Sequence, residues 1–179
     1  RNQKKLFIGF NRRFSKFSKK IKTLLSGYDV PKAIVINVNA GKIPLDSWIH
    51  DLDKGGGRLV GEACHFIDFS RFIIGKKIID YKKTSLVNKT NDTFSINLSF
   101  EDGSIASINY FANGHKSISK ERIEIFMDGK ILYLDNFRKL KGYGWPNFSG
   151  MLSIMQDKGQ TSMIKEIIQI LEKGGDPLI

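Results

Sequence analysis

Between residues 78 and 134, apolar side chains recur at every second position, and this pattern constrains the fold more than any other feature of the chain. A period of two predicts strands that bury one face and expose the other. Turn signals such as Asp102-Gly103 and Asp128-Gly129 separate strands and favour hairpins. The predicted strands are residues 78–87, 93–100, 104–111, 121–127 and 130–134.

Three helices are predicted around these strands. Ser15 is a candidate N-cap for a helix that ends at Gly27, and a second helix spans residues 61–74. Shorter strands are expected at residues 6–10 and 33–38, and a long loop at residues 39–54. Two of the helices precede most of the strands, which predicts an α+β fold: a large, mainly antiparallel, open-faced sheet with helices packed on one face. The third helix, residues 161–171, carries Ile164, Ile167, Ile168 and Leu171 on one side.

The uncovered face of such a sheet has consequences for assembly. Its outward positions are Phe94, Ile96 and Leu98, or the residues that alternate with them. Apolar positions on an open face are often buried against a second subunit. We therefore expect a homo-oligomer, either a dimer or a tetramer, joined through the open sheet face.

Composition sets limits on the class of protein. The chain has 179 residues, of which 41% are hydrophobic and 26% charged, so we expect residues 1–179 to form one globular domain. No apolar run reaches the length of a membrane span, and no signal peptide is recognisable. The one cysteine, Cys64, excludes an internal disulfide, and no Cys/His spacing predicts a metal site. A cytoplasmic protein is the simplest expectation, without a membrane partner.

The net charge of +11 raises the question of an anionic partner. Its lysines are scattered, and the only dense basic cluster lies within residues 12–22. A solvated basic surface is therefore favoured over nucleic-acid binding, for which no recognition motif is present. A small anionic substrate, such as a sugar carboxylate or a nucleotide-sugar, fits the charge at least as well.

Residues 55–72 carry the strongest chemical signal. A Gly-Gly-Gly turn leads into a helix on which Glu62, His65 and Asp68 follow one another at intervals of three, so they share one face. An imidazole flanked by acids suits proton transfer to or from a hydroxyl or carbonyl. The alternatives are a structural histidine, a glutamate placed by the helix dipole, and an aspartate that orients His65 or binds an arginine.

Other residues are candidates for a pocket. Arg12 and Arg13 either bind an anionic group or are surface charge, and Trp48 and His50 either form a pocket wall or a hydrophobic plug. A polar strand end at Asn109, Tyr110, Asn113 and Lys120 is a further candidate cleft wall. The glycines 55–57 are rejected as a dinucleotide loop, because no apolar strand precedes them. They predict a tight loop and a close approach of a ligand or another chain.

Several segments, taken in order, resemble one family. These are residues 9–15 (GFNRRFS), 38–41 (VNAG), 48–51 (WIHD), 55–68, 102–105 (DGSI) and 109–114 (NYFANG). Their order and spacing are similar to the C-terminal domain of the glucose–fructose oxidoreductase / inositol dehydrogenase / rhizopine-catabolism (Gfo/Idh/MocA) family. The branch fused to an alcohol dehydrogenase-like unit looks most similar.

This resemblance implies a two-domain, NAD(P)-dependent oxidoreductase of sugars, polyols or sugar-nucleotides. In that family an N-terminal Rossmann domain binds NAD or NADP and carries a catalytic lysine in a Glu-Lys-Pro motif. Neither that motif nor the dinucleotide loop is found here, so the resemblance implies that this chain is the substrate-binding and oligomerisation domain. Alone, it is expected to be inactive.

The resemblance also implies roles for single residues. His65 matches the family's histidine and would bind or deprotonate the reacting hydroxyl, with Glu62 as the second catalytic residue. The family's aspartate position is Gly61 here, and Glu62 points about 100° away from it on an ideal helix. The alternative is a non-catalytic binding or assembly module with the same fold. The implied substrate-binding residues are Arg12, Arg13, Asn39, Trp48, His50 and Asp68.

Overall fold

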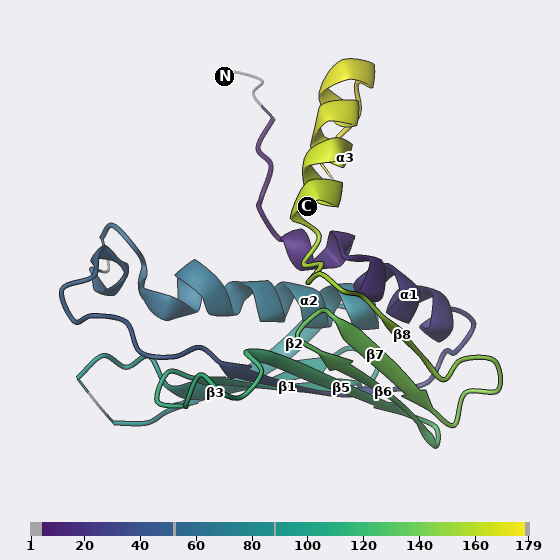
Figure 1. Cartoon of the computed structure of the whole chain (residues 1–179), viewed down its shortest axis with the longest axis horizontal. Coiled ribbons are helices and arrows are strands. Elements are labelled where there is room, and N and C mark those ends of the chain that lie inside the picture. The colour runs from purple at the N-terminus through teal and green to yellow at the C-terminus, as the bar shows by residue number, and fades with distance from the viewer. Residues whose placement is uncertain (1–4, 52, 88, 178–179) are drawn as a thin grey trace.

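The computed structural model describes residues 5–51, 53–87 and 89–177, and it has two packed layers with one helix outside them (Figure 1). Helices α1 (Lys16–Leu25) and α2 (Cys64–Ile74) lie across one face of an eight-stranded sheet. Helix α3 (Gln160–Lys173) rises away from both layers. The predicted α+β class is confirmed.

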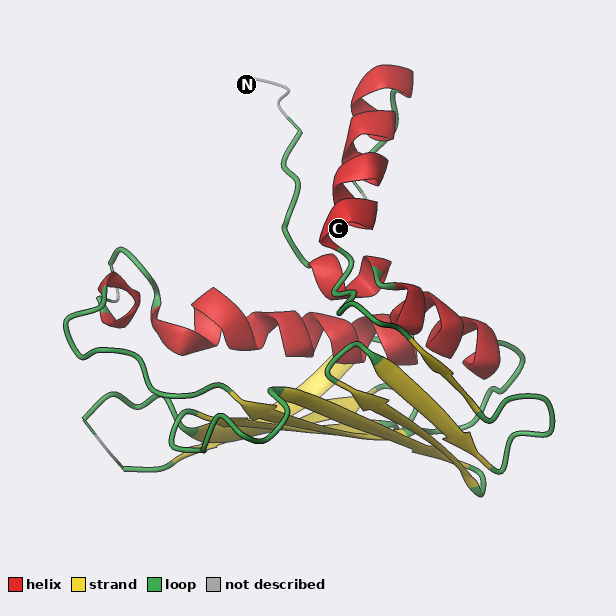
Figure 2. Cartoon of the chain, in the orientation of Figure 1, coloured by secondary structure: helices red, strands yellow, loops and turns green. Residues whose placement is uncertain are grey.

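The sheet is mixed but mainly antiparallel, and it stays open at both edges (Figure 2). Its strand order is β2-β3-β4-β1-β5-β6-β7-β8, and only β1 and β4 run parallel to each other. The antiparallel neighbours on either side follow the hairpins that the turn signals predicted. The strands are β1 (Ala33–Asn39), β2 (Ile78–Ser85), β3 (Phe94–Phe100), β4 (Ile105–Phe111), β5 (Glu121–Met127), β6 (Lys130–Asp135), β7 (Lys139–Tyr143) and β8 (Gly150–Leu152).

The core lies between the helices and the covered face of the sheet. Ile36, Ile108 and Ile123 come from three adjacent strands, and all three are fully buried beneath α1 and α2. Phe17 and Phe66 project from those helices into the same core. The period-two pattern thus supplies one continuous apolar layer, whose burial stabilises the fold.

The uncovered face of the sheet is polar at its centre. Phe94, Ile96 and Leu98 point towards the helices, so the outward residues are their alternates, Ser95, Asn97 and Ser99. Ser and Asn side chains form hydrogen bonds between neighbouring strands. Ser95 donates to Asn109 (2.8 Å), Asn109 to Asn37 (2.9 Å) and Ser107 to Asn97 (2.8 Å). The outward residues of β3 are therefore the alternates, and they are polar rather than apolar as expected for the open face.

One end of the open face is nevertheless apolar. Register pairs align one outward residue from each of five adjacent strands: Ile105, Ala33, Phe126, Ile131 and Tyr143. We call these five residues the apolar row. Ile105 and Tyr143 are each 52% exposed, so the row is open to solvent in the isolated chain.

Three sequence-based expectations about elements were wrong. Residues 6–10 form no strand, and Leu6 and Ile8 in that segment are exposed. Strands β7 and β8 were not predicted, because they are short and only Leu140 among their residues is buried. The second helix begins before residue 61, with a π-helical turn over Leu59–Ala63 that leads into α2.

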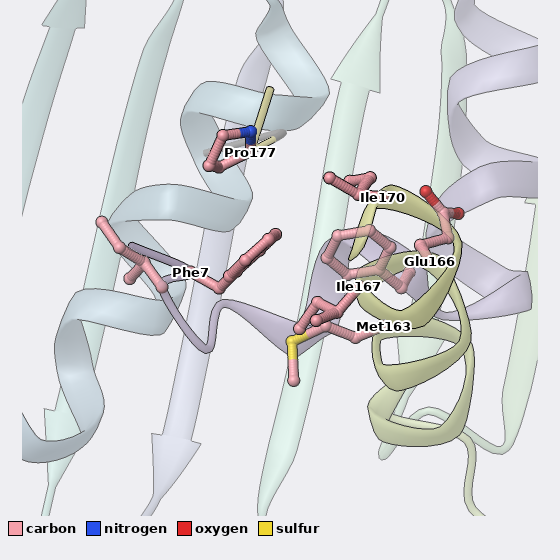
Figure 3. Close-up of a pocket in the computed structure, with 8 residues that line it drawn as sticks. Phe7, Met163, Glu166, Ile167, Ile170 and Pro177 are labelled. Atoms are coloured by element: carbon pink, nitrogen blue, oxygen red, sulfur yellow. The ribbon is translucent and has the colours of Figure 1, made fainter. Parts of the chain in front are cut away.

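Helix α3 packs on the extended N-terminal segment through a side that shares only Ile167 with the predicted apolar face. Met163, Ile167 and Ile170 face Phe7, while Ile164 and Leu171 of the predicted face are exposed (Figure 3). The hollow between the two segments holds about 20 Å³, room for about one water molecule. It is a packing seam rather than a ligand site.

Candidate functional site

A cleft of about 500 Å³ opens at the N-terminal end of the α2 region. We call it the α2 cleft. Its walls come from the 3₁₀ turn Asn11–Phe14, the loop after β1, the π-helical turn and the start of α3. Its charged or titratable lining residues are Arg12, Arg58, Glu62, His65, Lys120 and Lys158.

The glycine turn seats one wall of this cleft. A Cβ added to Gly55 would lie 2.6 Å from the Ile49 Cα and 2.6 Å from the Trp48 carbonyl oxygen, so only glycine fits there. Gly56 and Gly57 have φ values of +65° and +72°, which also favour glycine. The glycines therefore bring the Trp48 turn close to α2, and the segment that approaches them belongs to the same chain.

The π-helical turn changes which side chains meet at the cleft. A π turn holds more residues than an α turn, so the angle expected from an ideal helix does not apply across Leu59–Ala63. Gly61, Glu62 and His65 all line the cleft. Glu62 therefore reaches the same space as the histidine.

His65 is half-buried in the cleft wall, with its ring edge-on to Phe10 at 5.6 Å. Within the described part of the chain, its buried Nδ1 has no hydrogen-bond partner. Burial and the charge of the Arg12 guanidinium lower the pKa of His65, and the smaller, opposite effect of Glu62, Glu121 and Asp68 does not reverse this. The imidazole is therefore neutral at pH 7 and able to accept a proton.

Glu62 is the centre of one ion cluster. It accepts hydrogen bonds from the Tyr110 hydroxyl and from Arg58 (3.3 Å), and its other oxygen contacts the Lys120 ammonium at 2.6 Å. Arg58 Nε donates to the same Tyr110 hydroxyl at 2.6 Å. Burial alone would raise the pKa of Glu62, but the bonds from Lys120 and Tyr110 outweigh it and lower the pKa. Glu62 is thus a fixed carboxylate at neutral pH.

Glu121 is the centre of a second ion cluster behind the cleft. Its fully buried carboxylate accepts two bonds from Arg12, at 3.1 and 2.9 Å, and one from Lys158 at 2.7 Å. Burial opposes ionisation, yet the bonds and charge of Arg12 and Lys158 lower the pKa of Glu121. The Arg12 guanidinium also lies 4.5 Å over the Phe66 ring. Arg12 reaches the cleft already paired.

Arg13 and Asp68 bind each other rather than the cleft. Both guanidinium nitrogens of Arg13 that face Asp68 donate to its carboxylate, one of them at 2.6 Å. Neither residue lines the α2 cleft, and Asp68 makes no hydrogen bond to His65 among the described contacts. The predicted row of carboxylate, imidazole and carboxylate therefore does not form a hydrogen-bonded chain.

The remaining predicted pocket residues fall into two groups. Trp48 lines the cleft mouth and is 65% exposed, whereas His50 is not part of the lining and its Nε2 is buried without a partner among the described residues. Asn39 lies at the end of β1, where its amide donates to the carbonyls of His115 and Ile118. The structure brings together Arg12, Trp48, Glu62 and His65, and leaves Arg13, Asn39, His50 and Asp68 outside.

Sequence reasoning missed Arg58 and Lys158 as cleft residues. Arg58 directly follows the glycine turn, and its spacing of four from Glu62 on a helix was a usable signal. Lys158 had no local signal, since long-range contacts place it. Asn11 donates to the Lys158 carbonyl at 2.7 Å, and a Cβ on Gly159 would lie 2.3 Å from the Asn11 carbonyl oxygen.

The described residues contain no group of three or more His, Cys, Asp or Glu side chains placed to hold a metal ion. No helix among them has both the length and the apolar character needed to cross a membrane.

Comparison with known proteins identifies the family. Residues 31–132, more than half of the chain, match the GFO/IDH/MocA C-terminal domain model. The chain is 29% identical over 143 residues to an uncharacterized oxidoreductase, YrbE, of Bacillus subtilis, covering 74% of this chain and 41% of the relative. It is 26% identical over 144 residues to myo-inositol 2-dehydrogenase of Thermotoga maritima, covering 75% and 42%.

Solved structures support the same fold. The crystal structure of an oxidoreductase domain protein from Kribbella flavida aligns with a TM-score of 0.81 at 19% identity, covering 97% of this chain and 58% of that one. The chain spans about two fifths of the length of the curated relatives it matches. The fused alcohol dehydrogenase branch stays a prediction. The described fold and the family match together show that the chain belongs to the Gfo/Idh/MocA family and corresponds to its C-terminal domain.

Proposed function

We propose that this chain is the substrate domain of an NAD(P)-dependent oxidoreductase that acts on a hydroxyl or carbonyl of a sugar, polyol or sugar-nucleotide. The observation that carries the proposal is His65, a neutral imidazole in the wall of an open cleft. Its buried Nδ1 has no hydrogen-bond partner among the described residues. The exposed indole of Trp48 at the mouth offers a flat apolar surface for a sugar ring.

In the oxidation direction, His65 accepts the hydroxyl proton as the carbon–oxygen single bond becomes a carbonyl. In the reverse direction it returns that proton to the oxygen. A bound nicotinamide supplies the hydride acceptor or donor. The Gly55–Gly57 turn offers no cradle for its pyrophosphate, because the space beside Gly55 is filled by the Trp48–Ile49 backbone. We therefore assign cofactor binding to a Rossmann domain outside residues 1–179.

Two surfaces fit partners of this domain. The outer side of α3 exposes Ile164, Ile168 and Leu171, and a Rossmann domain is our proposed cover for it. The apolar row on the open sheet face is our proposed contact between copies of the chain. Measurement of the molecular mass of the native protein in solution tests the proposed contact between copies. If the contact exists, Phe126→Asp in the apolar row should shift the oligomer towards monomer.

The test of the catalytic proposal is His65→Ala in the longest natural protein that carries this chain. Turnover should fall about 100-fold or more, with little change in melting temperature. His115→Ala is the matched control, since His115 is exposed and lies outside the cleft. Near-normal turnover in the His65 variant would refute the assignment, and a large fall in melting temperature would make His65 a structural residue.

A non-catalytic binding or assembly module is the second candidate. The observation in its favour is that the Glu62 and Asp68 carboxylates are bonded to other residues, so neither is bonded to His65. Measurement of NAD(P) reduction by the native protein over a panel of sugars and polyols separates the two. Substrate binding without reduction of either cofactor would favour the module.

A further inference from the structure

We propose that the α2 cleft selects substrates that carry an anionic group, and that Lys120 and Lys158 provide the selecting charge. This inference rests on the proposed function, because it assigns a chemical class to the substrate of the same cleft. The anionic group is a carboxylate, as in a sugar acid, or a phosphate, as in a sugar phosphate or a nucleotide-sugar.

The first support is the balance of charge at the cleft. Four cationic side chains line it, namely Arg12, Arg58, Lys120 and Lys158. Within the described part of the chain only two carboxylates pair with them, Glu62 and Glu121. Two positive charges therefore remain uncompensated in one concave site. A cleft that concentrates one sign of charge attracts a ligand of the opposite sign.

The second support is how the four cations are bonded. Arg12 is held by two bonds to Glu121, and Arg58 donates to Tyr110, Glu62 and backbone carbonyls. The guanidinium groups of Arg12 and Arg58 are thus engaged with the protein, and that of Arg13 is bonded to Asp68 outside the cleft.

The lysines are different. Each ammonium has three N–H donors, and each contacts a single carboxylate oxygen among the described residues, at 2.6 Å for Lys120 and 2.7 Å for Lys158. Their remaining donors can bind an oxyanion, and the carboxylates hold both ammonium groups at the cleft.

The lysine positions are also built into the fold. Lys158 is fixed by the close approach of Gly159 to Asn11, and the neighbouring Asp157 carbonyl accepts from Ser15 at 2.7 Å. Lys120 directly precedes β5, and its backbone carbonyl accepts from the backbone N–H of Asn39 at 2.8 Å. These backbone contacts distinguish the two lysines from mobile surface lysines.

The experiment uses the two tryptophans as internal probes. Trp48 lines the cleft, whereas Trp145 packs on Tyr28 and donates its indole N–H to the Ile131 carbonyl at 3.1 Å. The chain is labelled with ¹⁵N and titrated with glucose, glucuronate and glucose 6-phosphate, while both indole N–H signals are followed. We expect the Trp48 signal to shift and the Trp145 signal to stay.

Glucuronate or glucose 6-phosphate should bind about tenfold more tightly than glucose, and added salt should weaken only the charged ligands. The tighter-binding of these two ligands shows whether the cleft prefers a carboxylate or a phosphate. Lys120→Gln and Lys158→Gln should each remove most of this preference, and Lys83→Gln, on edge strand β2 outside the cleft, should leave it unchanged.

The outcomes separate the two proposals. Equal affinity for glucose and both charged sugars would overturn the anion proposal and leave the sugar-binding cleft standing. A preference that persists in both cleft lysine variants would also overturn it. If no sugar shifts the Trp48 signal, the proposed function itself fails.

Discussion

The two ion clusters of this domain have the same composition and different settings. Glu121 and Glu62 each bind one arginine and one lysine. The Glu121 side chain is fully buried, whereas that of Glu62 is 22% exposed to the cleft. The Glu121 carboxylate is therefore closed to solvent and joins distant chain segments, whereas the Glu62 carboxylate is itself open to the cleft, and in our proposal each cluster offers its lysine to the ligand.

The arginines and lysines within each cluster also differ. Each arginine lies over an aromatic ring, Arg12 at 4.5 Å from the centroid of Phe66 and Arg58 at 5.2 Å from that of Tyr110. Each lysine is the more exposed partner, at 18% for Lys158 and 40% for Lys120. The arginines therefore serve as the fixed part of each cluster and the lysines as the part that faces the cleft.

The largest expected effect is that of Glu121→Ala. It leaves Arg12 and Lys158 without their buried carboxylate, and breaking a buried pair costs about 3–5 kcal/mol. Urea unfolding followed by circular dichroism measures the change in the free energy of unfolding. A loss below about 1 kcal/mol would contradict the view that the Glu121 cluster is structural.

Glu62→Gln should have a smaller effect on stability. The amide keeps the shape and an acceptor oxygen for Tyr110 but removes the charge that Arg58 and Lys120 face, so we expect a loss of about 1–3 kcal/mol. The same urea measurement checks this. A loss as large as that of Glu121→Ala would remove the distinction between the two clusters.

Acid should weaken both ion clusters. The pKa values of Glu62 and Glu121 are lowered in the folded chain, so their stabilisation is complete above the ordinary value of 4.5 and is lost as the pH falls through the lowered values. The lowered pKa of His65 adds a loss that starts below its ordinary 6.5. Melting temperature should therefore fall with acidification from pH 7 to pH 3.

The comparison of variants sharpens this test. In Glu121→Gln the fall in melting temperature below pH 4.5 should be shallower than in the wild type, because one titrating carboxylate is gone. In His65→Ala the decline that begins near pH 6.5 should disappear. An unchanged profile in either variant would show that another group dominates that pH range.

Lys120→Gln should have the smallest effect on stability. Its side chain is 40% exposed, and ion pairs of that kind contribute about 0–1 kcal/mol. Lys158→Gln removes a partner of a fully buried carboxylate and should cost more. The reverse order in thermal unfolding would mean that the Lys120 pair is better shielded than its exposure indicates.

Much of the fold was predictable because its signals are local. Ser15 caps α1 by accepting from the Phe17 amide, and the strands from Phe94 to Leu134 bury alternate residues as the period-two pattern predicted, whereas β2 buries none. Strand β8 has three residues and forms only by pairing with β7, so no periodicity marks it. The strand expected at residues 6–10 has no neighbour to pair with among the described residues, so its apolar pattern was misleading.

The site was less predictable, for a physical reason. His65, Glu62 and Trp48 lie near the glycine turn in sequence, and local spacing indicated them. The pairing of Arg12 with Glu121 joins residues 109 positions apart, and Asp68 is bonded to Arg13 across 55 positions. Charge pairing between distant segments has no local signature, and it decides which carboxylates remain for His65.

The position of β1 has a consequence for how the chain assembles. This strand lies at the centre of the sheet, yet its parallel partner β4 is about 70 residues further along, since Ala33 pairs with Ile105. At a synthesis rate of roughly 5–20 residues per second, β1 waits about 4–14 s for a neighbour. Strands β2, β3 and β4 can pair as soon as they are made, since they form a meander. The central strand, although synthesised first, can pair only after β4 has been made, and long-range pairing of this kind sets a slow folding rate.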